Sequence, residues 1–544
     1  MSWANEENGN NISNSINDDS DLNTRLLAAS DRAISTDRSS LRKERMKSIE
    51  FEESPRKLSV YIDLKEAQNY LNPYHLTNIG IFASYLAVGF NMYFIQTPLN
   101  YYMVYVLNAT AAQQTVVTGL LSLPWSLKIA CGFLSDTLPI FGYRRKSYFI
   151  LGWTTCIVCN VLLAVLVEPT LAETAALVFF ETMGMVLADV CTDACIVERS
   201  KAYEHIDNRG TLQATGYIIR FFGAIVGSIL GAILYNKNDS ADSWSWGLPI
   251  WGIFLLNAII PLTIITPFFY SLLEIQSEVP PSIKNQVTEI WNLVQRKAAW
   301  KPCCFIYIYN LLFLSNPAWN SFLVYGLGFT NFYLGLLTIV GSVISYFALV
   351  FYRYFLFDTP WRKIYLFTGF IGFVFSCLQL ILVFQINEKI GLGGLAGSLF
   401  FALGAYGVIQ FVAAIQFLPS VKMFLGLCPD GAEGASYAML TTISNLAGTA
   451  SYSIAGVCAN LWDVSNNTLA EHNYSGMWRL TLFCGCIQLM GLFFLPLLPN
   501  GIAEQVEMQA NDSNSKTAGI IFLSVIGISL TFVISFTIYT IING

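Results

Sequence analysis

The sequence predicts an all-α integral membrane protein, built from two related halves of six helices each. Of its 544 residues, 54% are hydrophobic and only 12% are charged, whereas a soluble chain carries about 25% charged residues. The apolar residues are gathered in blocks of about 20, the length that a helix needs to cross the hydrocarbon core of a bilayer. A motif that occurs once in each half indicates that a six-helix unit was duplicated.

Six apolar blocks precede a polar stretch and six follow it. The first six lie at residues 77–107, 112–134, 147–168, 173–197, 212–235 and 248–270. The second six lie at residues 303–325, 331–352, 363–384, 393–418, 433–460 and 474–498, and a candidate thirteenth span lies at 517–542. The predicted domains are a tail (1–75), the first half (76–270), a cytoplasmic linker (271–302), the second half (303–500), a polar linker (501–516) and an additional hydrophobic helix (517–544).

The first 75 residues are polar and rich in Ser, Asn and Asp, which is typical of a disordered tail. The tail is neither a signal peptide nor a typical transit peptide, because no apolar core follows its start and acidic residues come early. Ser35, Ser48 and Ser59 each follow an Arg by three positions, a common kinase recognition pattern. These serines are candidate phosphorylation sites; the alternative is a tail that serves only as a solvated tether.

The distribution of basic residues predicts the orientation. With the tail in the cytoplasm, the outer loops contain only Lys237 and Lys389, and the other basic loop residues face inward. Four glycosylation sequons also fall in the predicted outer loops; they begin at Asn108, Asn238, Asn466 and Asn473. We expect a multi-pass protein of the plasma membrane, with a plastid or another organelle as the alternative. No basic domain stands out, so a nucleic-acid partner is not expected.

The two halves repeat one motif between their second and third spans. Ser135-Asp136-Thr137 is followed by Tyr143-Arg144-Arg145-Lys146 in the first half. Phe357-Asp358-Thr359 is followed by Trp361-Arg362-Lys363 in the second half. Such duplication is the architecture of secondary transporters, in which one half rocks against the other around a site near the membrane midplane.

Two acidic residues stand out in the fourth span. Asp189 precedes the membrane-edge residue Arg199 by ten positions, which is about 15 Å along a helix. Asp193 lies one turn further on the same face. A charge at the centre of a membrane helix costs about 2.5–3.5 kcal/mol, so each acid needs a partner, a proton or water. We expect Arg220 of the fifth span as the partner, either fixing the helices together or forming part of a substrate or proton site.

Other polar residues predict a pocket and a gate. Spans one and seven occupy equivalent positions in the two halves, so Tyr93 and Gln96 of the first and Trp319 and Asn320 of the second could line one pocket. At the membrane edge, Glu198 is expected to pair with one of the paired arginines of the motif. The sequence has no nucleophile motif, phosphate-binding loop or zinc-ligand spacing, so we predict neither an enzyme nor a cofactor.

Several motifs resemble a known family. Residues 132–136 with 142–146 resemble the loop signature of the major facilitator superfamily, with an insertion between its parts. Residues 124–148, 189–201 and 427–448 resemble, in order and spacing, the folate–biopterin transporter family. One departure is that the family usually has Lys-Pro where this chain has Lys128-Ile129. The resemblance implies a major-facilitator-type 12-helix bundle with the thirteenth helix outside it.

The resemblance also implies uptake of folates, pterins or related metabolites by alternating access, coupled to H+. Alternatives are a carrier of another organic solute, such as S-adenosylmethionine, and a membrane sensor that does not transport; the partners expected are a small molecule, H+ and membrane lipid. The predicted substrate- or proton-binding residues are Asp189, Asp193, Arg220, Lys128, Tyr93, Gln96, Trp319, Asn320, Asn445 and Glu433. The predicted cytoplasmic gate comprises Gly132, Asp136, Arg144, Arg145, Glu198 and Arg199.

Overall fold

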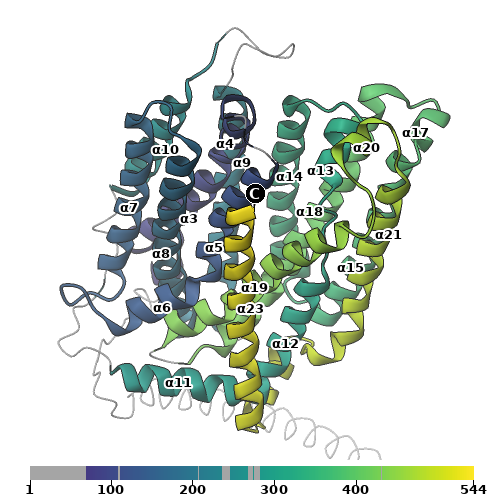
Figure 1. Cartoon of the computed structure of the whole chain (residues 1–544). Coiled ribbons are helices and arrows are strands. Elements are labelled where there is room, and N and C mark those ends of the chain that lie inside the picture. The colour runs from purple at the N-terminus through teal and green to yellow at the C-terminus, as the bar shows by residue number, and fades with distance from the viewer. Residues whose placement is uncertain are drawn as a thin grey trace, which may run out of the picture. The chain divides into compact units, whose positions relative to one another are not determined.

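The computed structural model describes residues 69–543, apart from 108, 110, 206–207, 236–245, 267–273, 275–281, 430–431 and 512. Within this part of the chain every regular element is a helix (Figure 1). The first half contains α3 (Leu76–Phe94), α4 (Gln96–Tyr101), η1 (Tyr102–Val106), α5 (Ala111–Ser126), α6 (Lys128–Thr137), α7 (Lys146–Val165), α8 (Leu171–Tyr203), α9 (Thr211–Leu234) and α10 (Ile250–Ile265). The remainder contains α11 (Ile283–Gln295), α12 (Lys297–Leu312), α13 (Trp319–Ser321), η4 (Phe322–Gly326), α14 (Asn331–Phe351), η5 (Tyr352–Leu356), α15 (Trp361–Leu378), α16 (Leu380–Val383), α17 (Ile386–Lys389), α18 (Gly394–Leu427), α19 (Glu433–Ala459), α20 (Asn466–Ala470), α21 (Ser475–Met490), η6 (Gly491–Leu497), α22 (Ile502–Ala510) and α23 (Lys516–Asn543).

Every predicted apolar block contains a helix. Among the described residues, nine helices are long and apolar enough to cross a membrane, and α5 with α6, bent by 41°, makes a tenth. The helices α10 and α12, of 16 residues each, correspond to the sixth and seventh blocks. Span seven is interrupted, because α12 ends at Leu312 and α13 begins only at Trp319.

Two helices, α11 and α22, lie in the stretches predicted as linkers. The first, α11, carries Ile283, Val287, Ile290 and Trp291 along one stripe, separated by polar residues. Ile290 and Trp291 pack on the core, whereas Ile283 and Val287 are exposed. Figure 1 shows α11 lying across the end of the bundle that is predicted to face the cytoplasm. A helix of this kind is too polar on average to span a membrane and is suited to lie at the membrane interface.

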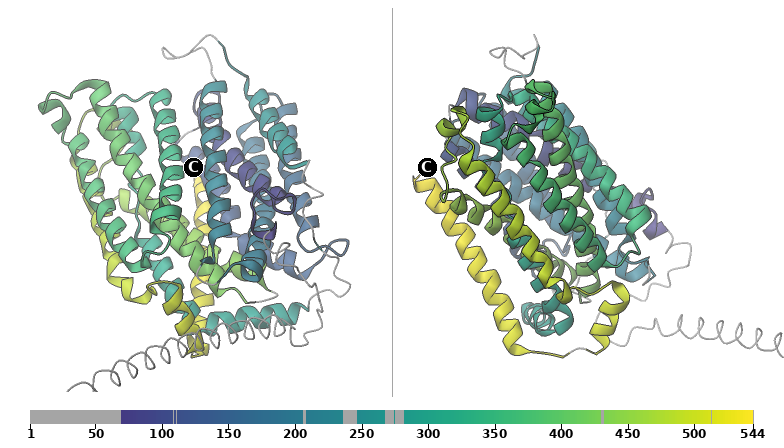
Figure 2. Two further views of the ribbon diagram at one scale, coloured as in Figure 1. Left: turned by 180° about the vertical axis from the view of Figure 1, so that it is seen from behind. Right: turned by 90° about the vertical axis from the view of Figure 1, so that its right-hand side faces the viewer.

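The two halves meet along two seams. One seam is the contact of α9 with α14, and the other is the contact of α5 and α6 with α19. In Figures 1 and 2 the first half, in purple and blue, lies beside the second half, in green. The thirteenth block forms α23, which packs against both α5 and α19 and therefore contacts both halves (Figure 2).

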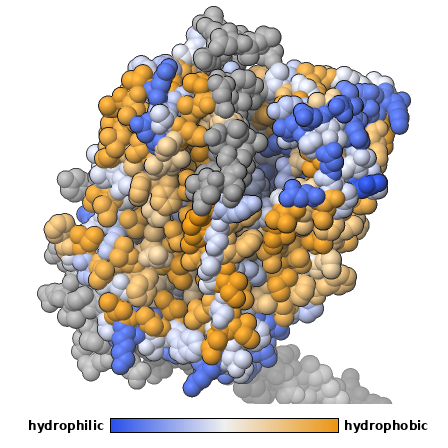
Figure 3. Space-filling view, in the orientation of Figure 1, coloured by the Kyte–Doolittle hydropathy of each residue, from blue (hydrophilic) through white to orange (hydrophobic). Residues whose placement is uncertain are grey.

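The surface has the polarity of a membrane protein. Figure 3 shows apolar side chains over most of the face that carries α23. Hydrophilic side chains gather at the upper right, around α17 and α20, and along the lower edge. Of the predicted glycosylation sites, Asn466 and Asn473 are exposed in this upper region. Asn108 and Asn238, like Ser35, Ser48 and Ser59, lie outside the described residues.

Glycines allow α9 to lie directly on α3. A Cβ atom at Gly223 would be 2.2 Å from the carbonyl oxygen of Leu86, and one at Gly227 would be 2.5 Å from that of Phe90. These distances are far below van der Waals contact, so a side chain at either position forces the two helices apart. A stripe of small residues is how membrane helices reach such close contact.

Gly227→Ala is expected to destabilise the protein by about 1–3 kcal/mol, because the added methyl group overpacks the contact of α9 with α3. The measurement is the thermal unfolding midpoint of the detergent-solubilised protein, followed by size-exclusion chromatography. Gly404→Ala on α18, where a Cβ atom meets nothing within 4 Å, is the matched control. Equal midpoints for the two variants would contradict the expectation.

Candidate functional site

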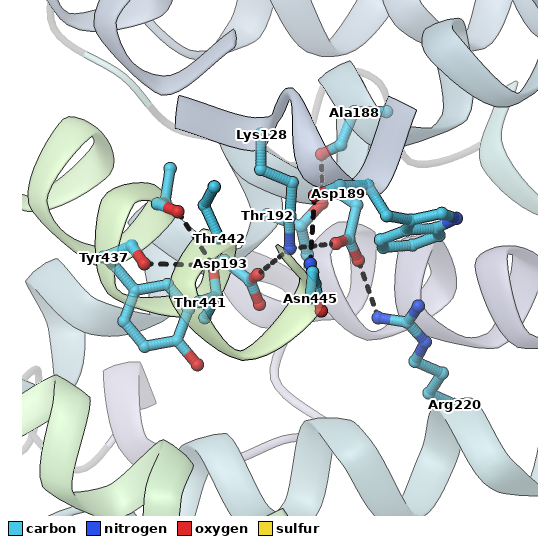
Figure 4. A network of polar contacts seen from close by, with 12 residues as sticks. Lys128, Ala188, Asp189, Thr192, Asp193, Arg220, Tyr437, Thr441, Thr442 and Asn445 are labelled. Carbon is cyan, nitrogen blue, oxygen red and sulfur yellow. Dashed lines mark hydrogen bonds and ion pairs between the residues drawn. The ribbon is translucent and has the colours of Figure 1, made fainter. Parts of the chain in front are cut away.

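Four charged side chains meet in the first half and form what we call the charged network (Figure 4). The Lys128 ammonium is 2.7 Å from Asp189 Oδ2 and 3.0 Å from Asp193 Oδ2. The Arg220 guanidinium is 2.9 Å from Asp189 Oδ1. Arg220 is therefore the partner of Asp189, as expected from the sequence, but Asp193 pairs with Lys128 instead. Both carboxylates and the lysine are almost completely buried.

The bend between α5 and α6 places Lys128 at this depth. It breaks the helix at Leu127, and such a break leaves backbone groups without helical partners. The second half binds two of them: Asn445 Nδ2 donates to the Trp125 carbonyl at 3.0 Å, and the Ile129 N–H donates to Thr442 Oγ1 at 3.1 Å. A proline at position 129 has no N–H to donate, so Ile129 adds a contact between the halves here.

Hydrogen bonds extend the network to the second half. Asp193 Oδ1 accepts from Tyr85 Oη at 2.5 Å. Gln213 Nε2 lies 3.2 Å from Asp193 Oδ1 and 3.2 Å from the hydroxyl of Tyr437 on α19. The ring of Trp125 lies 5.1 Å from Arg220 Cζ, within the range of a cation–π contact.

The charged network is electrically balanced. Two cations face two carboxylates, so burial requires no proton on either acid. Two neighbouring carboxylates disfavour each other's charge, which would favour a proton on one of them. In the structure Lys128 lies between Asp189 and Asp193, and together with Arg220 it compensates both charges.

A cavity of about 480 Å³ lies next to the charged network. Trp125 and Met92 line it and also contact Arg220, the latter through a 3.3 Å contact from Arg220 Nη2 to the Met92 sulfur. Both halves contribute lining residues, which include Asn91, Tyr93, Gln96, Ser122 and Glu181 of the first half and Thr338, Ser342, Ser345, Tyr406 and Gln410 of the second. Its size lies within the roughly 300–1,000 Å³ of small-molecule sites.

The expectation that Trp319 and Asn320 line this pocket is wrong. Because span seven is interrupted after Leu312, Trp319 lies in the short helix α13 and packs against Phe322, with the ring centroids 5.4 Å apart. Asn320 is exposed. The second half instead contributes α14 and α18 to the cavity.

Two further candidates also lie away from the cavity lining. Asn445 bonds to the backbone at the α5–α6 break, as described above. Glu433 is the first residue of α19 and is buried at the end of that helix that contacts α6 of the other half. Neither belongs to the residues that line the cavity.

The halves touch at the predicted cytoplasmic end through what we call the inner contact. It is formed by Gly132 and Asp136 of α6 with Gly434 and Ala435 of α19. Asp136 Oδ2 accepts the Ala435 N–H at 2.6 Å, an interaction that the partial positive charge of a helix N-terminus favours. A Cβ atom at Gly132 would be 2.8 Å from the Gly434 carbonyl oxygen, so the backbones are in close contact.

Arginines from the repeated motif surround the inner contact. Asp136 forms ion pairs with Arg144, at 3.1 Å, and with Arg145. Arg145 also pairs with Glu198 at 3.0 Å, one of the two pairings expected. Burial alone would lower the pKa of Arg145, but Asp136 and Glu198 raise that pKa well above its ordinary value. Arg199 bonds within the first half, to the Thr77 carbonyl at 2.9 Å and to Asn78.

Glu181 is a cavity residue that the sequence reasoning missed. It lies on α8, eight residues and therefore about two turns before Asp189, and its side chain is buried. The signal was present, because residues eight apart lie on the same side of a helix. It was not predicted because no second acidic residue lies one turn away from it, which is the pattern that makes Asp189 and Asp193 stand out.

Comparison with known families shows to which protein family this chain belongs. The model of the BT1 family matches residues 88–518. The chain belongs to the BT1 family. A relative named "Folate-biopterin transporter", from Synechocystis sp. (strain ATCC 27184 / PCC 6803 / Kazusa), is 27% identical over 438 residues, which cover 79% of this chain and 84% of the relative.

Solved structures show the fold of this BT1 family member. The crystal structure of a D-xylose-proton symporter is similar with a TM-score of 0.55 and 14% identity, over 78% of this chain and 97% of that chain. That of a Major Facilitator Superfamily transporter, FucP, in the outward conformation has a TM-score of 0.50 and 11% identity, over 78% and 99%. The major-facilitator fold is thus confirmed. The chain is an integral multi-pass membrane transporter of small molecules and not an enzyme.

Proposed function

We propose that this transporter carries folates and pterins by alternating access and that its cycle is coupled to protons. The observation that carries the proposal is the cavity, which both halves line and which adjoins the buried charged network. A rocking motion of the halves would expose such a cavity to one side of the membrane at a time. The curated relative's name supports the substrate class.

The cavity's side chains suit the chemistry of these substrates. The flat pterin ring would stack on the aromatic rings of Tyr93, Trp125 or Tyr406, which line the cavity. The carboxylates of folate would bind Arg220, because a guanidinium matches a carboxylate in a bidentate manner. Arg220 is reached past Trp125 and Met92, which contact both it and the cavity.

Substrate binding would then act on the charged network. A folate carboxylate at Arg220 competes with Asp189, whose Oδ1 atom is 2.9 Å from the guanidinium. Asp189 retains Lys128 at 2.7 Å, and Lys128 follows directly on the break that Asn445 and Thr442 of the other half bind. This chain of contacts connects the ligand to the seam that must open and close.

The test of transport is uptake of labelled folic acid and biopterin into proteoliposomes, with and without an inward proton gradient. We expect saturable uptake that the gradient stimulates and that either unlabelled compound inhibits. Absence of uptake of both compounds by folded, inserted protein would overturn the substrate assignment. Saturable uptake of S-adenosylmethionine under the same conditions would point to a carrier of another solute. Absence of uptake of all three compounds would favour a membrane sensor that does not transport.

Arg220→Gln together with Asp189→Asn is expected to raise the KM for folic acid about tenfold and to change the KM for biopterin much less. Biopterin has no carboxylate for Arg220, and the paired change keeps the charged network balanced. A lost bidentate ion pair of about 1.4 kcal/mol corresponds to this tenfold change. Initial rates of uptake at varied concentration give both constants, with Gly404→Ala as control. Equal increases for both substrates would exclude Arg220 as the carboxylate ligand.

A further inference from the structure

We propose that Glu181 is the group that takes up and releases the transported proton. This inference rests on the proposed proton-coupled transport and assigns its proton site. Glu181 lies in α8 at the wall of the cavity, and only 2% of it is exposed. Water or substrate that enters the cavity reaches it without passing through the charged network.

The neighbours that bond to the Glu181 carboxyl are neutral. Oε1 lies 3.4 Å from Asn160 Nδ2 and 3.6 Å from the Cys156 sulfur, and Oε2 lies 3.3 Å from Thr182 Oγ1. Among the described residues no Lys, Arg or His forms an ion pair with Glu181. Asp189 and Asp193, by contrast, have Lys128 and Arg220 as partners. An isolated carboxylate is costly to bury, so an enclosed Glu181 favours its neutral form.

The available hydrogens also fit a protonated carboxyl. The Thr182 hydroxyl has one hydrogen, and it donates this to the Val178 carbonyl at 2.9 Å. The 3.3 Å contact between Thr182 Oγ1 and Glu181 Oε2 is then a hydrogen bond when Glu181 supplies the proton. Asn160 Nδ2 has two hydrogens: one reaches the Cys156 carbonyl at 3.0 Å, and the other reaches Glu181 Oε1 at 3.4 Å. Glu181 therefore has only long hydrogen bonds from neutral donors to stabilise its ionised form.

The surrounding helices contribute amides and weak acids. Behind Asn160, the α10 residue Asn257 donates to Asn160 Oδ1 at 3.0 Å and lies 3.1 Å from Asn91 Oδ1 of α3. The titratable groups that face this region are Cys156 and Cys159 on α7, Tyr93 on α3, Tyr406 on α18 and, two turns away on α8, Asp189. The nearest cations, Arg220 on α9 and Lys128 on α6, are both paired with Asp189 and form no ion pair with Glu181.

The proton step follows from this environment. With the cavity hydrated, a hydronium ion gives a proton to a carboxylate oxygen of Glu181: one O–H bond of the hydronium breaks, the O–H bond of the carboxyl group forms, and a water molecule is left. The neutral side chain can then be enclosed without the cost of a buried charge. When the cavity opens to the side of lower proton activity, the same O–H bond breaks and the proton returns to water.

Glu181→Gln tests the proposal, because glutamine keeps the shape and hydrogen bonding of the protonated acid but cannot ionise. In proteoliposomes we expect gradient-driven accumulation of folic acid to fall to the level measured without a gradient. Exchange of external label against internal substrate should persist and become independent of pH. Substrate-induced alkalinisation of the medium, read with a pH dye, should disappear.

Control experiments distinguish a wrong assignment of the proton site from an absence of proton coupling. Glu181→Asp keeps an ionisable group and should restore part of the coupled uptake with a displaced pH profile. Infrared difference spectra should contain a protonated-carboxyl band in the wild-type protein that is lost in Glu181→Gln. Gradient-driven accumulation by Glu181→Gln at the wild-type level would overturn the assignment. A wild-type protein that transports without gradient stimulation would instead overturn the proposed proton coupling itself.

Discussion

Lys128→Met is expected to cost about 3–5 kcal/mol of folding stability and to abolish uptake, because it removes the cation that two buried carboxylates share. Lys128 lies 2.7 Å from Asp189 and 3.0 Å from Asp193. Methionine has a similar length and preserves the packing, so the loss isolates the charge. The thermal unfolding midpoint in detergent measures the first effect, and uptake by equal amounts of inserted protein measures the second.

A second substitution tests whether the pairing of these charges accounts for the loss of stability. After Lys128→Met, Asp189 retains Arg220 at 2.9 Å, whereas Asp193 retains only neutral donors such as Tyr85. Adding Asp193→Asn should therefore recover most of the lost stability. Adding Asp189→Asn gives the same net charge but leaves both Arg220 and Asp193 without an oppositely charged partner, so it should not. Equal recovery by both additions would show that net charge, and not the pairing in the structure, governs stability.

The helical bundle could be predicted because the features that define it can be read along the sequence without knowledge of tertiary contacts. Apolar length defines a span, and the side that carries basic residues defines its direction. The pairing of Arg220 with Asp189 was also predictable, since charges within a membrane need partners. The same reasoning could not place Lys128 between two acids, because the size of the bend that brings it there, 41°, cannot be read from the order of apolar and charged residues; in the structure a helix of the other half bonds to this break.

The errors at the candidate site have a related cause. Equivalence of spans one and seven predicted that Trp319 would line the cavity together with Tyr93. The repeats have diverged, however: span seven is interrupted before Trp319, and the motif's Arg362 pairs with Glu504 at 2.9 Å, whereas Arg144 pairs with Asp136. Duplication conserves the order of the elements, but the contacts of each copy are set by its own neighbours.

Gly132→Ala is expected to hold the transporter open at its predicted cytoplasmic end. The added Cβ atom would lie 2.6 Å from Ala438 Cβ, 2.8 Å from the Gly434 carbonyl oxygen and 3.1 Å from Ala435 Cα. Two of these atoms belong to the α19 backbone, so they cannot yield by a rotamer change. The overpacking costs about 1–3 kcal/mol. Because α6 and α19 belong to opposite halves, the shift separates the inner contact and does not merely loosen one half.

A penalty of this size changes the ratio of closed to open forms by about 5–150-fold. Uptake should fall correspondingly, since a cycle of alternating access requires the inner contact to close. Cys131, which is buried in a cluster with Ala438, should react several times faster with a soluble maleimide, as quantified by mass spectrometry. Gly448→Ala on the same α19, where a Cβ atom meets nothing within 4 Å, should leave both measurements unchanged. Unaltered Cys131 labelling in Gly132→Ala would mean that α6 and α19 can move apart without opening a path between the halves, and the inner contact would then have no role as a gate.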